Sequence, residues 1–389
     1  MQSGGRLGLF GLMAGFGLSL ILAGCAGPTA PTANVAIPER ITSDTVDRTL
    51  PSPPATPTST MSPTPEPTEP IVIGWAGDTI PASTRHGLPT DPRTLLGPIS
   101  EQLRSPDLMV VNLEGTLGSR GVSKCRRWVV RDCHAFQAPP QYARTVIAAA
   151  GIDAVNTANN HSFDYGDVGQ ADTRKALAGA GVAATGGVDE VTFVDVRGTK
   201  VALVGFATYG WGADLRDAAQ VRDLVRRARA GADVVVVMLH AGAEGTDAAH
   251  TPNRVEWHLG EDRGNSRAVA HLAVDEGADL VVGSGPHVLR GMEVYRGRLV
   301  AYSLGNLVGY GGAFQVSGDL ALSGILRVRL RPDGTLESAR LIPLRIGADG
   351  IPRPDGTSAA LRRVRELSRA DFGRNAVRVE ADGTLRPPS

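Results

Sequence analysis

The segment Asp233-Val-Val-Val-Val-Met-Leu-His-Ala-Gly-Ala-Glu244 carries the pattern from which we predict the fold. Its run of apolar residues, from Val234 to Leu239, is typical of a strand that is buried on both faces. The run stops at His240, and another ionisable side chain, Glu244, follows one short loop later. The segment therefore indicates a sheet covered on both sides, with strands that end in residues able to take part in chemistry.

Other segments share this character, a short apolar run that stops close to Gly, Asn or His. They are Ile71–Ala76, Asp107–Asn112, Asp153–Thr157, Val201–Phe206 and Asp279–Gly283. Segments with helical spacing of apolar residues lie between them, namely Leu95–Arg104, Gln141–Ala150, Gly169–Ala180, Leu215–Ala230 and Ser266–Glu276. This alternation of strand and helix predicts right-handed crossovers and a largely parallel sheet.

Two predicted hairpins follow. Their strands are Met292–Tyr295 with Leu299–Ser303, and Leu320–Leu330 with Leu336–Leu344. Residues 71–345 are many for a single sheet, but they suit an α/β domain of two stacked sheets with helices outside. For residues 346–389, which are rich in Gly, Pro and Arg, we expect a tail with one amphipathic surface helix, Ser358–Arg369.

Residues 1–25 resemble the signal peptide of a bacterial lipoprotein. A single charge, Arg6, precedes an apolar stretch, and the sequence Leu22-Ala-Gly-Cys25 is similar to a lipobox. Cys25 would then receive a diacylglyceryl group and begin the mature chain. The alternative is a signal anchor over residues 7–26, because about 20 apolar residues can span a bilayer. Both interpretations place the rest of the chain outside the cytoplasm and attached to the cell membrane.

Residues 26–70 are predicted to form a disordered linker. Of these 45 residues, 11 are Pro and 10 are Thr, so the segment has too little apolar surface to offset the entropy of ordering. Chains rich in proline are extended and semi-rigid. The linker would therefore hold the folded domain away from the membrane.

The composition limits the redox chemistry and the partners of the chain. If Cys25 is lipidated, Cys125 and Cys133 are the remaining cysteines, and outside the cytoplasm we expect them to form a disulfide. Two buried free thiols, or a metal site that includes His134, are the alternatives. The 40 basic residues balance 40 acidic residues, which argues against a nucleic-acid partner.

Polar residues of the types that bind metals or transfer protons stand where the predicted strands end. They are Asp78, Asn112, Glu114, Asn159, Asn160, His161, Asp164, His240, Glu244, His287 and Asn306. Taken singly, each has a structural explanation, such as a cap or a turn. Because the carboxyl ends of strands line the ligand crevice of open α/β sheets, we expect a shared site. Carboxylate, imidazole and amide ligands suit Zn, Mn or Fe, which can activate water.

The order of these motifs resembles the CapA family of capsule-synthesis proteins, which is associated with bacterial poly-γ-glutamate biosynthesis. The motifs are Gly77-Asp78, Asn112-Leu-Glu114, Ala158-Asn-Asn-His161 with Asp164 and Gly166, His240 with Gly242 and Glu244, Gly283 with Pro286-His-Val288, and Tyr302-Ser-Leu-Gly-Asn306. That family is similar to the calcineurin-like metallophosphoesterases. The resemblance therefore implies a four-layer α/β/β/α sandwich with a dinuclear metal site between the sheets.

The resemblance also implies a role for each residue. The metal ligands would be Asp78, Glu114 as the carboxylate between two ions, Asn160, His240 and His287. The candidate catalytic residues are His161 as proton donor, Asp164, which would fix the turn after it, and Glu244. The candidate substrate contacts are Asn112, Asn159 and Asn306.

The chain departs from the family pattern at Ser284 and Gly285, where many members have two histidines, and at Asp78, which is followed by Thr79 and Ile80 and so forms no Asp-x-His motif. One weakly held metal, or none, is therefore an alternative to the dinuclear site. Two functions therefore remain open. The first is a metal-dependent hydrolase or transferase that acts on polyglutamate or another anionic envelope polymer. The second is a non-catalytic accessory subunit of a capsule synthesis or export complex, whose crevice binds the polymer.

Overall fold

The structure is a computed structural model that describes residues 69–84, 86–127 and 133–388. The predicted signal segment with Cys25, and the linker up to residue 68, lie outside these ranges. Among the described residues, no helix combines the length and the apolar character that crossing a membrane requires.

The first of two large sheets has ten strands in the described residues, with β1 (Ile71–Ile80) near its centre. Parallel strands continue the sheet on one side of β1, in the order β2 (Leu108–Leu113), β5 (Ala154–Asn156) and β6 (Ala183–Thr185). Antiparallel strands continue it on the other side, in the order β17 (Leu322–Leu330), β18 (Leu336–Ile346), β21 (Thr384–Arg386) and β20 (Arg378–Val379). Two further strands pair with β1 and β18, respectively: β16 (Asn306–Gly309) and β19 (Pro352–Pro354).

The second sheet has seven strands in the described residues, and its central strands are parallel. Its order is β14 (Met292–Tyr295), β15 (Arg298–Ala301), β13 (Leu280–Ser284), β10 (Val234–His240), β8 (Thr199–Ala207) and β7 (Thr192–Val196), and β9 (Ala213–Asp214) pairs with β8. Two small ribbons complete the strands, β3 (Thr116–Leu117) with β4 (Gln137–Ala138), and β11 (Trp257–His258) with β12 (Glu261–Asp262).

Both faces of β10 are buried, because alternate residues of a strand point to opposite sides of its sheet. Val236 points to the first sheet and belongs to the same apolar cluster as Trp75 of β1. Val237 points outward, into a cluster with residues of α4 (Ala218–Gly231) and α5 (Ser266–Asp275). The continuous apolar run in this strand is therefore explained by two separate cores.

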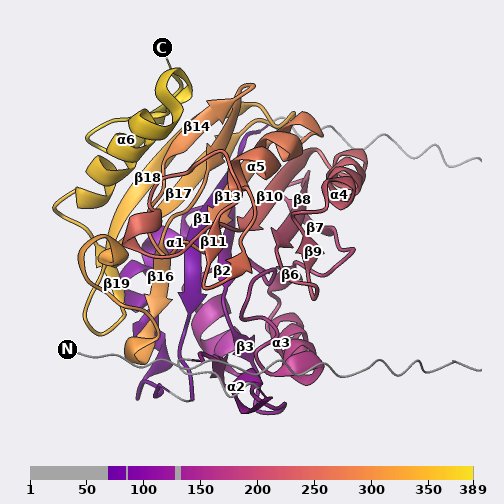
Figure 1. The fold of residues 1–389 in the computed structure, drawn as a ribbon, viewed down its shortest axis with the longest axis vertical. Helices are drawn as coiled ribbons and strands as arrows, with labels where there is room; N and C mark the ends of the chain where they lie inside the picture. Colours follow the sequence, from indigo (N-terminus) through magenta and orange to yellow (C-terminus); the bar gives the residue numbers. More distant parts are fainter. Residues whose placement is uncertain (1–68, 85, 128–132, 389) are drawn as a thin grey trace, which may run out of the picture. The chain divides into compact units, whose positions relative to one another are not determined.

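The outer face of the first sheet is covered by helical segments. They are α1 (Ser100–Arg104), η3 (Ala143–Ala148) and α3 (Gly166–Gly179), and their apolar side chains pack against β2 and β5. The layers are therefore helices, sheet, sheet and helices (Figure 1). This order confirms the predicted α/β/β/α sandwich.

The predicted strands are all present, with small shifts at their ends. The predicted helix Leu95–Arg104 is wrong as a continuous element, because Gly97 and Pro98 interrupt it and proline lacks a backbone donor. Short turns over Pro92–Leu95 (η1) and Gly97–Ile99 (η2) precede α1 instead. The remaining short helical turns are Thr246–Ala248 (η4), Tyr310–Gly312 (η5), Gly318–Ala321 (η6) and Gly373–Asn375 (η7).

The expectation of a tail over residues 346–389 is wrong. The chain after β18 forms β19, helix α6 (Ala359–Phe372), β20 and β21, and α6 lies beside β18 in Figure 1. Leu361 and Val364 of α6, together with Val379 and Leu385, fill one end of the core between the sheets. The apolar face of the helix was visible in the sequence, but the partner that buries it was not.

Cys125 and Cys133 form the predicted disulfide, with their Cα atoms 5.5 Å apart. Cys125 lies in the short helix α2 (Lys124–Arg127), and Cys133 precedes β4. The neighbouring residues Lys124 and His134 both reach the site described below, so the disulfide ties together two segments that contribute to it.

Gly283, in β13, has close contacts both with the other sheet and with a neighbouring segment of its own sheet. Its carbonyl oxygen accepts a hydrogen bond from Nε1 of Trp75, 3.2 Å away in the other sheet. A Cβ atom added at Gly283 would lie 2.1 Å from the carbonyl oxygen of Tyr302, which is backbone and cannot move aside. Only glycine fits at this position of β13, next to the backbone of Tyr302.

We therefore expect Gly283→Ala to lower the free energy of unfolding by about 1–3 kcal/mol, because the added methyl group overpacks the core. Gly179→Ala is the control, since a Cβ atom at this helical position meets nothing within 4 Å. It should leave stability unchanged or raise it slightly. Urea unfolding of both variants checks this, and equal stability of the two would contradict the steric argument.

Candidate functional site

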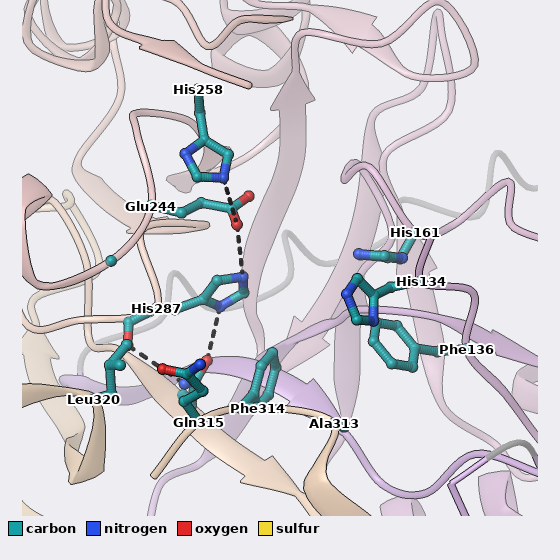
Figure 2. A pocket seen from close by; sticks show the side chains of 12 residues that line it. His134, Phe136, His161, Glu244, His258, His287, Ala313, Phe314, Gln315 and Leu320 are labelled. Atoms are coloured by element: carbon teal, nitrogen blue, oxygen red, sulfur yellow. Dashed lines mark hydrogen bonds and ion pairs between the residues drawn. The ribbon is translucent and has the colours of Figure 1, made fainter. Parts of the chain in front are cut away.

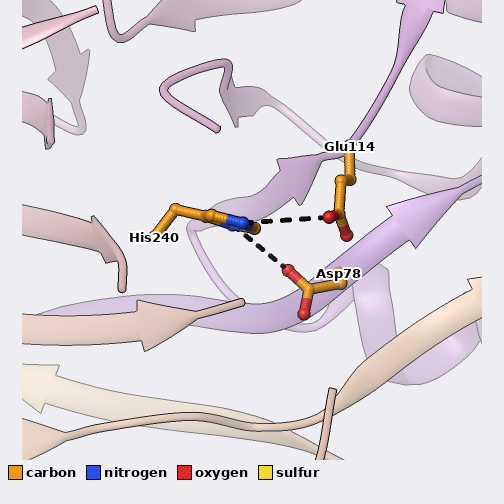
Figure 3. Close-up of side chains that lie close together, drawn as sticks. All are labelled: Asp78, Glu114 and His240. Carbon is orange, nitrogen blue, oxygen red and sulfur yellow. Dashed lines mark ion pairs between the residues drawn. The ribbon is translucent and has the colours of Figure 1, made fainter. Parts of the chain in front are cut away.

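Four ionisable side chains from the two sheets meet where their strands end. Asp78 is in β1, Glu114 follows β2, His240 ends β10, and His287 follows β13. The first three are fully buried, and Figure 3 shows them facing one another. The structure thus brings together four of the residues that the sequence marked as candidate metal ligands.

A bulge in β1 aims Asp78 at this cluster. The pairing of β1 with β2 shifts register between Ala76 and Asp78, and bulges re-aim side chains in this way. The extra residue is Gly77, where a Cβ atom would lie 1.9 Å from the carbonyl oxygen of Gly305. In the dipeptide Gly77-Asp78, glycine is therefore required by the lack of space, and aspartate supplies the carboxylate.

Asp78 accepts hydrogen bonds on both carboxylate oxygens. Nδ2 of Asn112 donates to Oδ1 (2.8 Å), the backbone N–H of Gly285 donates to Oδ2 (3.0 Å), and Nδ1 of His287 lies 3.1 Å from Oδ2. Burial opposes the charge of Asp78, but the hydrogen bond and charge of His287 lower its pKa overall. Burial likewise opposes the charge of His287, but Glu114 and Asp78 raise its pKa to about 10.

Glu114 is fully buried, yet neither of its carboxylate oxygens has a hydrogen-bond donor among the described residues. The Nε2 atoms of His240 and His287 each lie 3.8 Å from Oε1. Burial, and then the charge of Asp78, raise the pKa of Glu114 well above its usual value. A buried carboxylate without donors is unfavourable, and a cation beside it would offset this cost.

His240 is suited to act as a neutral ligand. Burial is the main cause that lowers its pKa to about 3, so the imidazole stays uncharged at neutral pH. Its Nδ1 lies 3.2 Å from Nδ2 of Asn112 and 3.3 Å from Oγ of Ser284. Ser284, which stands where the family resemblance suggests an imidazole, therefore contacts a candidate ligand instead of adding another.

Glu244 is held at the edge of the cluster as a carboxylate. Nη1 of the buried Arg263 donates to its Oε1 (2.6 Å), and Nε2 of His258 lies 3.3 Å from its Oε2. Nε2 of His287 is 3.6 Å from the same oxygen. Burial opposes the charge, but the hydrogen bond from His258 and the charges of His287 and Arg263 lower the pKa of Glu244 well below its usual value.

His161 is oriented by a carboxylate and a lysine. Oδ2 of Asp164 lies 2.8 Å from its Nδ1, and Nζ of Lys124 lies 2.7 Å from the other oxygen of Asp164. Burial lowers the pKa of His161 more than the charge and hydrogen bond of Asp164 raise it. The preceding Asn160 has a buried Oδ1 with no hydrogen-bond donor in the described part of the chain.

The three candidate substrate asparagines have different surroundings. Oδ1 of Asn112 accepts hydrogen bonds from Asn156 (3.1 Å) and Asn159 (3.3 Å), and Asn159 also donates to the carbonyl oxygen of Leu113. These side chains join the strand ends to one another instead of facing a ligand. Asn306 differs, since its Oδ1 lies 2.8 Å from Nδ1 of His287 and it lines the pocket described next.

A pocket of about 360 Å³ opens beside the cluster (Figure 2). Its lining includes four histidines, His134, His161, His258 and His287, together with Glu244. His287 is therefore shared, because it contacts the buried carboxylates and also faces the pocket. A ligand in this pocket would meet the candidate catalytic residues His161 and Glu244 directly.

The cluster fits one divalent cation. Asp78, Glu114 and His240 offer ligand atoms that all lie within 4.8 Å of one another, and this donor set suits Mn, Zn or Fe. His287, a predicted ligand, also contacts Asp78 and Asn306, and its Nε2 lies 3.8 Å from Oε1 of Glu114. The dinuclear site that the resemblance implied, with His287 and Asn160 as further ligands, stays a prediction.

Several residues at the site were missed by the sequence analysis. They are Lys124, Asn156, His258 and Arg263. Lys124 comes from the disulfide-linked segment, and His258 and Arg263 come from the β11–β12 hairpin and the residue after it. None of these three follows a buried strand, so the pattern that marked the other residues could not find them. Asn156 ends β5 and carried that signal.

The fold is an α/β/β/α sandwich, and a cluster of carboxylates and imidazoles lies at the strand ends of both sheets. The protein is therefore of the class of two-sheet α/β sandwiches with a candidate metal site at the strand ends. Residues 72–310 match the family model described as bacterial capsule synthesis protein PGA_cap, which covers more than half of the chain. The chain belongs to this family, and the resemblance to capsule-synthesis proteins is confirmed.

Curated relatives agree with this family. The chain is 29% identical over 250 residues to the capsule biosynthesis protein CapA of Bacillus anthracis, covering 61% of this chain and 58% of the relative. It is 33% identical over 180 residues to the PGA biosynthesis protein CapA of Bacillus subtilis, covering 42% and 44%. It is 30% identical over 298 residues to a probable polyglutamine synthesis accessory protein of Mycobacterium tuberculosis, covering 69% and 73%. The alignments span about half the length of the first two relatives.

Solved structures are similar at a lower level. A hypothetical protein from Thermus thermophilus has a TM-score of 0.43 and 14% identity, covering 71% of this chain and 99% of that one. A putative 5'-nucleotidase from Staphylococcus aureus has a TM-score of 0.40 and 15% identity, covering 76% and 58%.

If the cluster binds a cation, Mn²⁺ or Zn²⁺ should raise the melting temperature of the protein. At 100 times the dissociation constant the stabilisation is about 2.7 kcal/mol. Glu114→Gln should abolish this shift, because the carboxylate that lacks donors is removed. Without metal at neutral pH, the variant should be no less stable than the wild type, since the raised pKa of Glu114 means that its charge disfavours folding there.

Differential scanning calorimetry with and without the metal measures both effects. The control is Glu337→Gln, at a partly exposed residue paired with Arg329, which should keep the metal-dependent shift. A wild-type protein that shows no shift with Mn²⁺, Zn²⁺ or Fe²⁺ would contradict the metal site.

Proposed function

We propose that this chain acts in the biosynthesis of an anionic envelope polymer, and that the strand-end cluster is a metal-dependent hydrolytic or transfer centre. Membership of the capsule-synthesis family supports the first part. The names of the Bacillus relatives refer to capsule and PGA biosynthesis, which suggests a polymer such as polyglutamate as the substrate.

The observation that carries the second part is the state of Glu114. Its buried carboxylate has no donor among the described residues, although Asp78 beside it accepts a hydrogen bond on each of its oxygens. A structural carboxylate would be expected to have partners, because unpaired buried charge is costly. The arrangement is understandable if a cation completes it. A bound divalent ion would supply a Lewis acid and an activated water at this position.

The residues of the chain provide the remaining chemistry around the pocket. His161, oriented by Asp164, can exchange a proton with a leaving group or a water molecule. His287, whose pKa is raised by the neighbouring carboxylates, faces the pocket and can contact a carboxylate of the polymer. Glu244, held by Arg263, lies beside His287 and can accept a hydrogen bond from the polymer backbone.

A second candidate function is a non-catalytic accessory subunit that binds the polymer. Gly285 favours the accessory function. Its backbone N–H donates a hydrogen bond to Oδ2 of Asp78, at a position where many family members have an imidazole. The Mycobacterium tuberculosis relative is named as an accessory protein, which also supports this interpretation. In that case the pocket would bind polymer within a capsule synthesis or export complex.

Turnover distinguishes the two candidates. The purified protein with Mn²⁺ or Zn²⁺ should shorten or transfer poly-γ-glutamate. Size-exclusion chromatography of the polymer measures this change in length. His161→Ala should keep the metal-dependent melting shift but lose turnover about 10²–10⁴-fold, because its role is proton transfer and not ligation. If His161 acts as an acid, the rate should fall as pH rises through a pKa below 6.5, since burial lowers it.

Binding of polymer without turnover under every metal and pH condition would reject the enzymatic function and leave the accessory function. Lys175→Ala serves as a control, because this residue is outside the pocket lining and should not change either quantity.

We also propose that residues 1–25 are a lipoprotein signal, that Cys25 carries a lipid, and that residues 26–70 tether the domain to the outer surface of the membrane. The lipobox-like sequence before Cys25 supports this location.

Cys25→Ala should block fatty-acid incorporation and signal cleavage, because the acceptor thiol is lost. Metabolic labelling with a fatty acid, together with the mass of the product, measures both. Cys125→Ala is the control and should be labelled like the wild type. Equal labelling of Cys25→Ala and wild type would refute lipid attachment at this residue.

A further inference from the structure

The C-terminal part of the chain forms a second pocket, of about 550 Å³, that the proposed function does not use. Four arginines line it: Arg365 and Arg369 from α6, Arg374 after the helix, and Arg378 from β20. Glu380 is the acidic residue in the lining, so the lining side chains carry three positive charges in excess. We propose that this pocket binds an extended polymer with repeated carboxylates, at a place separate from the strand-end cluster.

The four guanidinium groups are not neutralised by the described part of the protein. Arg365 donates to the backbone oxygen of Val379 (2.8 Å), and Arg378 donates to that of Pro387 (3.2 Å). Arg369 and Arg374 have no hydrogen-bond or ion-pair partner for their side chains among the residues that the structure describes. Like charges that gather around one hollow repel one another, and a bound anion would remove this cost.

Arginines elsewhere in the described residues show the contrast. Arg229, Arg263 and Arg290 each pair with a carboxylate, as do many of the exposed arginines. A cation near the end of α6 is favoured by the helix dipole, which explains Arg369. It does not explain Arg378, which lies on a strand. Single arginines without a carboxylate partner, such as Arg104 and Arg144, also occur elsewhere in the described residues. What distinguishes the pocket is that four of them line one hollow.

The pocket lies at the end of the sheets opposite to the cluster. The strand pairings show which part of β1 lies level with β21. Leu385 of β21 pairs with Ala339 of β18, Ala339 pairs with Val328 of β17, and Val328 pairs with Ile73 of β1. Ile73 precedes Asp78 by five residues of the chain, which is about 17 Å of strand. The lining residues also lie after residue 310, where the match to the family model ends.

The shape and chemistry of the pocket favour a carboxylate polymer over a lipid surface. Guanidinium groups bind carboxylates through paired, charge-assisted hydrogen bonds. The pocket is a hollow, and none of the large exposed apolar side chains of the described residues lines it, whereas proteins that bind membranes usually add such anchors. That the polymer is one of the cell envelope rests on the proposed function, but the binding of a polycarboxylate here does not.

The test measures the binding of fluorescein-labelled poly-γ-glutamate to the full chain in detergent by fluorescence anisotropy. Arg374→Glu should weaken binding about tenfold or more and reduce its dependence on salt, because one charge-assisted contact becomes a repulsion. Arg345→Glu is the matched control, since it reverses the charge of another exposed arginine, which does not line the pocket. It should bind like the wild type, and circular dichroism should show both variants folded.

The metal-dependent melting shift separates this proposal from the proposed function. If Arg374→Glu keeps this shift but loses polymer binding, the second site is supported whether or not the protein shows turnover. Two outcomes would overturn the proposal: equal binding by Arg374→Glu and wild type, or a defect of Arg374→Glu that is confined to phosphatidylglycerol vesicles.

Discussion

Two carboxylates, Asp78 and Glu114, are buried where the two sheets meet. The need to compensate their buried charge explains the residues that surround them. Charge taken out of water needs opposite charge or donors close by, or the folded state loses stability. The first sheet supplies the amide of Asn112, and the second supplies His287 and the backbone of Gly285. Glu114 is left without donors in the described part of the chain. This imbalance, more than the identity of any one residue, is what makes the cluster a candidate centre for a cation.

The fold was largely predictable, because its strands are buried on both faces. Such strands appear as continuous apolar runs, and β10 is the clearest case. Elements whose formation depends on tertiary contacts were harder to predict from the sequence. Residues 95–104 have helical spacing, but Gly97 and Pro98 interrupt the helix. The segment after β18 looked like a tail because it is rich in Gly, Pro and Arg, and its apolar residues are buried only where α6 packs against strands of both sheets.

The candidate site was predictable to the extent that its residues follow strands. Asp78, Glu114 and His240 are brought together by the convergence of strand ends, which is a property of the architecture. Lys124, His258 and Arg263 come from a disulfide-linked segment and a hairpin, whose positions no local pattern specifies. Asn112 and Asn159 show a different limit. Their residue type suits ligand contact, but their hydrogen bonds show that they join strand ends to one another.

The hydrogen bond between Trp75 and Gly283 spans the boundary between two halves of the chain that are synthesised at different times. Asp78 and Glu114 come from the first half, whereas His240 and His287 come from the second. A nascent chain therefore presents acidic groups before any of its imidazole partners exists, and the assembled centre appears only after both sheets have stacked. If the cluster binds a cation, binding requires both halves of the chain, and a chain that ends before His240 would lack the complete set of donors.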